Sequence, residues 1–160
     1  MTNNIIIFIH LAAAGVAIGS LTYTLLLFLP AMQKIPQPKT AEEHSVSYKA
    51  FETLAPTVFV CVIVLIGSGV YYLMENYANQ VNLKAGYYNL FGFKMIFVIA
   101  AFFLSVYSAF SLRTRIEHLD LVPENRALVP SVLKKMQQLG VLSLGAIVLA
   151  AFCGVWLARF

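Results

Sequence analysis

Four long apolar runs dominate this sequence of 160 residues. They lie at about residues 5–29, 54–74, 90–112 and 138–158. Each run has about the 20 residues that a helix needs to cross a hydrocarbon core roughly 30 Å thick. Only 11% of the residues are charged, whereas soluble domains carry about 25%. Because backbone polar groups in lipid must be hydrogen-bonded internally, we expect an all-α integral membrane four-helix bundle that forms one domain over residues 1–160.

The basic residues are concentrated between the first and second runs and between the third and fourth. These residues are Lys34, Lys39, Lys49, Arg113, Arg115, Arg126, Lys134 and Lys135. The middle connector has only Lys84 outside the apolar runs. The positive-inside rule therefore predicts cytoplasmic first and third connectors, with both termini outside, on the periplasmic side of a plasma (inner) membrane. The distribution of the basic residues thus explains the net charge of +4 by membrane topology, so the charge gives no support to nucleic-acid binding.

His10 opens the stretch HLAAAGVAIGS within the first run. It lies about five residues, or roughly 8 Å, below the expected outer end of that helix. An ionisable side chain at such a depth indicates a functional site. Imidazole is a common ligand of haem iron and of copper. The alternative is a histidine that only hydrogen-bonds a neighbouring helix.

Lys94 and Met95 lie near the start of the third run. Lys94 is four residues past Leu90, so about 6 Å below the expected outer surface of the membrane. Lys94 shares a helix face with Ala101, Ser105 and Ser108, which favours an inward orientation. The alternative is a lysine that extends its ammonium group to the lipid headgroups. Met74 closes the second run on the same side. Methionine sulfur can bind haem iron or Cu(I), although single methionines also fill gaps in cores. Tyr71 and Trp156 fall in the same outer layer and are candidates to pack around a cofactor.

Only one histidine of the chain lies within an apolar run. A haem bound by His10 would therefore be five-coordinate, use Met95 or Lys94 as its second ligand, or recruit His10 from a second copy in a homodimer. The sequence has no HExxH, CxxC, P-loop or GxGxxG pattern. Hydrolase, zinc-protease and nucleotide-dependent activities therefore have no support.

The order of these features resembles the small CopD-like membrane proteins. That group includes copper-resistance protein D domains and HemJ-type protoporphyrinogen oxidases. The matching segments are HLAAAGVAIGSLTYTLLLFLPAM, YKAFETLAPTVFVCVIVLIGSGVYYL and AGYYNLFGFKMIFVIAAFFLSVYS. The positions that carry the resemblance are His10, Gly19, Pro30, Gly67 or Gly69, and Lys94.

The HemJ branch implies haem b, with the first-helix histidine as an axial ligand and the third-helix lysine in the site. The CopD branch implies copper handling at the outer face of the membrane. The fourth run lacks the Arg and Asn-Glu-x-Pro features of the HemJ branch. The resemblance therefore favours haem binding over protoporphyrinogen oxidation.

The function expected from the sequence is haem b binding around His10, Lys94 and Met95, with an electron-transfer or oxidoreductase role. The sequence leaves open whether the protein is an enzyme. One alternative is copper bound by His10, Met74 and Met95, with Cys153 as a further candidate. Another is a cofactor-free accessory subunit of a larger membrane complex. Under all of these hypotheses, the expected partners of the protein are the lipid bilayer and either a second copy, other subunits or a redox partner.

Overall fold

A computed structural model describes residues 2–34, 41–79, 86–112 and 129–157 of the chain. All regular structure in these ranges is helical. The helices are α1 (Thr2–Tyr23), α2 (Leu29–Lys34), α3 (Ala41–Asn79), α4 (Tyr87–Val106) and α6 (Val129–Leu157), and the π-helical segments are η1 (Thr24–Phe28) and η2 (Tyr107–Leu112). The expected all-α fold is confirmed. The parts of the basic connectors at 35–40 and 113–128 lie outside the described residues.

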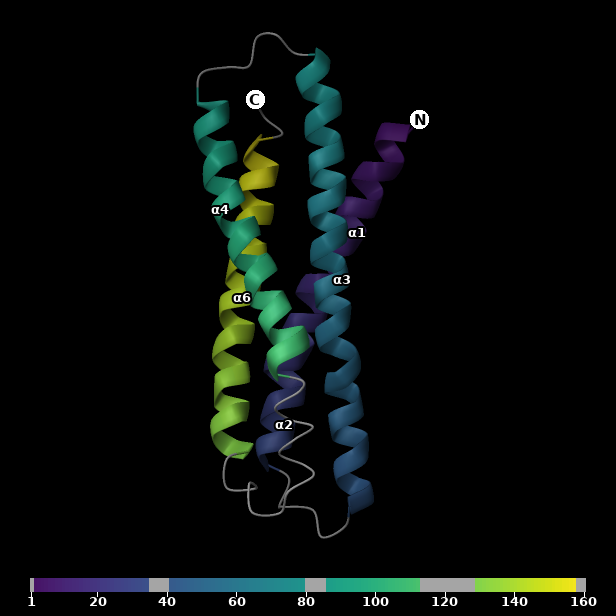
Figure 1. Cartoon of the computed structure of the whole chain (residues 1–160), viewed down its shortest axis with the longest axis vertical. Coiled ribbons are helices and arrows are strands. Elements are labelled where there is room, and N and C mark those ends of the chain that lie inside the picture. Colours follow the sequence, from purple (N-terminus) through teal and green to yellow (C-terminus); the bar gives the residue numbers. More distant parts are fainter. Residues whose placement is uncertain (1, 35–40, 80–85, 113–128, 158–160) are drawn as a thin grey trace.

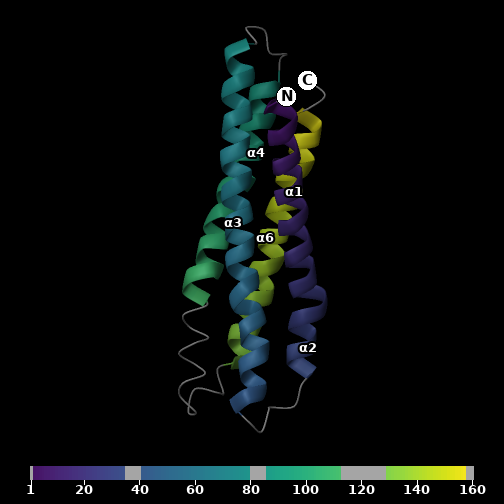
Figure 2. The same cartoon turned by 90° about the vertical axis from the view of Figure 1, so that its right-hand side faces the viewer.

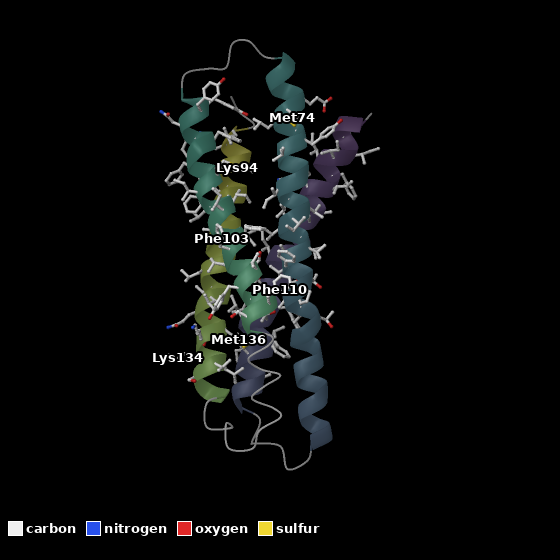
Figure 3. All side chains as sticks on the ribbon, viewed as in Figure 1. Met74, Lys94, Phe103, Phe110, Lys134 and Met136 are labelled. Atoms are coloured by element: carbon white, nitrogen blue, oxygen red, sulfur yellow. The ribbon has the colours of Figure 1, made fainter. Side chains whose placement is uncertain are left out.

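Four helical segments are long and apolar enough to cross a membrane. They are Asn4–Ala31, Thr53–Glu75, Tyr87–Ser111 and Ser131–Leu157. Large apolar side chains point outward along all of them, including Phe103 and Phe110, which are 64% and 60% exposed (Figure 3). An apolar exterior of this extent is unfavourable in water and suits contact with lipid. These helices match a multi-pass membrane protein.

The first apolar run continues as a helix beyond its proline. The backbone widens into η1 immediately before Pro30, and α2 then continues to Lys34. Proline has no N–H group, and its ring clashes with the carbonyl four residues earlier in a regular α-helix. A wider π turn before Pro30 accommodates the ring without ending the helix. In the second run, Pro56 lies inside the 39-residue helix α3.

The four long helices form an antiparallel bundle (Figure 1). α1 packs most extensively against α3, and α4 against α6, while smaller contacts join α1 to α6 and α3 to α4. One end of the bundle therefore contains the start of α1, the end of α3, the start of α4 and the end of α6 (Figure 2). At this end α1 diverges from α4 and α6 (Figure 1).

The buried core lies mainly in the opposite half and at mid-height. One cluster contains Leu25, Leu29, Ala55, Leu133 and Met136. A second contains Ala17, Leu21, Val58, Val62, Ala101, Ala146 and Ile147. We call segments 4–16, 63–75, 87–100 and 148–157 the open half, because only Ala13 and Cys153 are buried among them. The loosest packing in the described bundle is therefore at the end where the sequence predicts the functional site.

Gly140 permits a close approach between α6 and η1. A Cβ atom at Gly140 would lie 2.9 Å from Cδ2 of Leu25, a core side chain that is only 8% exposed. We expect Gly140→Val to lower the free energy of unfolding by about 1–3 kcal/mol, because overpacking outweighs the small gain in helix propensity. The midpoint of unfolding in mixed detergent micelles measures this change.

Gly145→Val on the same helix is the matched control, since nothing lies within 4 Å of a Cβ atom there. Adding Leu25→Ala to Gly140→Val should recover part of the lost stability, because the smaller side chain makes room for the valine. Equal midpoints for Gly140→Val and Gly145→Val would contradict this packing.

Candidate functional site in the open half

His10 joins α1 to α3 through one hydrogen bond. Its side chain is half-buried, and its Nδ1 atom lies 2.7 Å from Oγ of Ser68. The two residues are 58 positions apart in the sequence. They meet because α1 and α3 run antiparallel, so a residue near the start of α1 lies beside a residue near the end of α3. The imidazole of His10 therefore has a specific partner on a neighbouring helix.

The hydrogen bonds of Ser68 determine which imidazole nitrogen carries the proton. Oγ of Ser68 lies 2.6 Å from the carbonyl oxygen of Val64. A carbonyl oxygen only accepts, so the single hydroxyl hydrogen is donated to Val64. Oγ must then accept the hydrogen bond from Nδ1–H of His10. In the neutral imidazole this assignment leaves Nε2 of His10 without a proton, so that it presents a lone pair.

Gly69 lies directly beside the imidazole ring. A Cβ atom at Gly69 would be 3.7 Å from Cε1 of His10, whereas one at Gly67 would have nothing within 4 Å. Of the two glycines in this position of the sequence pattern, the structure thus places Gly69 against the histidine. The GSG triplet contributes both the hydrogen-bond acceptor and the space for the ring.

Lys94 lies on α4 and reaches α6 (Figure 3). A Cβ atom at Gly154 would lie 3.3 Å from Nζ of Lys94 and 3.8 Å from its Cε. The side chain is half-buried and interacts electrostatically with the neighbouring Cys153. It also interacts electrostatically with His10. The structure therefore brings the two ionisable residues singled out in the sequence into one region.

The other residues predicted from the sequence differ in exposure. Met95 is half-buried beside Lys94. Met74 is 69% exposed on α3, and Tyr71 and Trp156 are 46% and 53% exposed. Trp156 packs edge to face on Phe152, with ring centroids 5.8 Å apart. Cys153 is buried at 5% exposure, and His10, Lys94 and Met95 are more enclosed than Met74, Tyr71 and Trp156.

Two residues of this site were missed from the sequence. Ser68 was not singled out, although a serine between two glycines in an apolar run is a visible polar signal. Gly154 is one of several small residues on the fourth run, and nothing in the sequence distinguishes it from the others. In the described part of the chain, no group of three or more His, Cys, Asp or Glu side chains has the arrangement of a metal site. A metal here would depend on His10 and on ligands of other kinds.

Comparisons with models of protein families, with curated proteins and with solved structures find no match to this chain. The resemblance to CopD-like proteins therefore stays a prediction based on the residues quoted above.

Proposed function

We propose that this chain is a haem b-binding integral membrane protein with an electron-transfer or oxidoreductase role. The observation that supports it best is the state of His10, whose Nδ1–H is held by Ser68 while Nε2 keeps its lone pair. Histidines that bind metals almost always donate their other ring N–H to a neighbouring acceptor, which fixes the tautomer and the ring orientation. His10 meets this requirement through its hydrogen bond to Ser68.

The surroundings of His10 also favour a large flat ligand. Gly69 adds no side chain beside the ring, and the open half buries only Ala13 and Cys153 among its described residues. Haem in a helical bundle is held by side chains projecting from facing helices. His10 would bind the iron, and Met95 is a candidate for the second axial position. Haem held in this way supplies one-electron redox chemistry.

The proposed orientation follows from the basic connectors. The positive-inside rule would place the open half at the outer face of the plasma membrane, with both termini. The site would then be reached from the periplasmic side. A redox partner or substrate would meet the protein there.

The decisive test is an optical spectrum of the purified full chain. Cells are grown with a haem precursor, and the protein is purified in detergent. We expect a Soret band and an α band in the dithionite-reduced minus oxidised difference spectrum. A spectrum without these bands, from protein that is folded and supplied with haem, would overturn the proposal.

Gly69 and Gly67 offer a matched pair of variants near the imidazole. Gly69→Val should lower haem content about tenfold, because the methyl groups of valine extend beyond a Cβ atom already in contact with His10. Gly67→Val should retain haem, since nothing lies within 4 Å of a Cβ atom there. The ratio of Soret absorbance to protein concentration measures the haem content of both variants. Equal haem content in the two variants would show that the imidazole position does not control binding.

A further inference from the structure

The ammonium group of Lys94 has no carboxylate partner within the part of the chain that the structure describes. The structure places this group beside Gly154, near the thiol of Cys153 and, at longer range, near the imidazole of His10. None of these supplies a formal negative charge to a protonated lysine as a carboxylate would. A charged group in a membrane-embedded bundle is costly unless it is paired. An anion from outside the described chain would offset that cost.

The direction of the Lys94 side chain favours an internal anion partner over extension of the ammonium group toward the lipid headgroups. Lysines near helix ends extend along the protein surface to place the ammonium group in water. Lys94 instead contacts α6, since both its Cε and its Nζ lie within 4 Å of a Cβ position at Gly154. Gly154 thus makes room for the end of the lysine side chain between two helices. The ammonium group is held inside the open half.

Building on the proposed haem function, we propose that Lys94 binds a carboxylate of the ligand whose iron is bound by His10. Haem b carries two propionate carboxylates at one edge of the macrocycle. The site would therefore recognise an acidic porphyrin at two points, with His10 on the metal and Lys94 on a carboxylate. Gly154 is a positioning residue, because it sets where the ammonium group lies.

A carboxylate suits Lys94 better than the iron does. A protonated lysine has three N–H donors and no lone pair, so it can donate to a carboxylate but cannot ligate a metal. Charge-assisted hydrogen bonds of this type are stronger than neutral ones. Removal of one such bond lowers affinity roughly 10- to 100-fold. This assignment leaves Met95 as the candidate second axial ligand on α4.

The test compares haem b with its dimethyl ester, in which both propionates are neutral. The full chain is purified from haem-deficient cells in an uncharged detergent and titrated with each compound. We expect the wild type to bind haem b roughly 10- to 100-fold more tightly than the ester. Lys94→Met should remove this preference, and Lys94→Arg should keep most of it because the charge is retained.

Gly154 is tested against a glycine on the same helix. Gly154→Val should weaken the preference for haem b over the ester, because its side chain would occupy the position of the ammonium group. Gly145→Val should leave the preference unchanged, since it has open space around it.

The outcomes separate the two proposals. Binding of both compounds with equal affinity, still lost in His10→Ala, would overturn the role of Lys94 and leave the haem proposal in place. Equal weakening of both compounds by Lys94→Met, with a changed axial-ligand spectrum, would identify Lys94 as an iron ligand and also overturn it. Absence of binding by the wild type to either compound would overturn the haem proposal itself.

Discussion

Replacement of His10 with Ala should abolish the proposed haem binding. The variant loses the one histidine within the four candidate membrane spans. We expect haem content to fall at least roughly tenfold, which corresponds to a loss of about 1.4 kcal/mol or more in binding free energy. The measurement is the Soret absorbance per protein after purification. Far-ultraviolet circular dichroism of the same sample should be unchanged, because His10 is only half-buried.

Imidazole in solution provides a sharper test of the same residue. His10→Ala leaves space where the ring was, and added imidazole should restore a Soret band if the histidine acts as a ligand. The matched control is His44→Ala, which changes a histidine outside the membrane-spanning segments. A His10→Ala protein with wild-type haem content and an unchanged spectrum would show that the histidine is structural.

Ser68→Ala should weaken haem binding about 10- to 100-fold, even though Ser68 would not touch the iron. The substitution removes the acceptor that holds Nδ1–H, so the imidazole loses both its fixed tautomer and its fixed orientation. Ser68→Thr should retain binding, because a threonine hydroxyl can make the same bond to a carbonyl in the preceding helical turn. Haem titration of the three proteins measures the difference.

Ser105→Ala is the control for loss of a serine hydroxyl within the bundle. Ser105 is buried, and its Oγ donates to the carbonyl oxygen of Phe102 at 2.8 Å, in the same helix. Its loss should cost no more than about 1 kcal/mol of stability and leave haem affinity unchanged. Equal haem affinities for wild type and Ser68→Ala would show that the bond to His10 is not required.

The proposed roles of His10 in iron binding and of Lys94 in carboxylate binding depend on different parts of the bundle. The His10 and Ser68 variants test the contact between α1 and α3, and the Lys94 and Gly154 variants test the contact between α4 and α6. Because these pairs lie on different helices, a variant that disrupts one pair should leave the other in place. Combining Ser68→Ala with Lys94→Met should therefore weaken haem binding more than either change alone.

The sequence alone determined the secondary structure of the spanning segments. Apolar runs of this length must be helical in lipid, because no water is present to satisfy backbone groups. The structure has four helices in these runs that are long and apolar enough to cross a membrane. Because an α-helix rises by about 1.5 Å per residue, the positions of His10 and Lys94 within their runs also predict similar depths for the two side chains.

The tertiary structure decided which helix faces meet. Hydropathy gives a helix its length but not its rotation about its axis or its choice of neighbour, because nearly every face of these helices is apolar. Ser68 became the partner of His10, and Gly154 the neighbour of Lys94, only once the packing of α1 on α3 and of α4 on α6 was defined. The sequence thus predicted similar depths for His10 and Lys94, and the packing of the helices decided what each of them contacts.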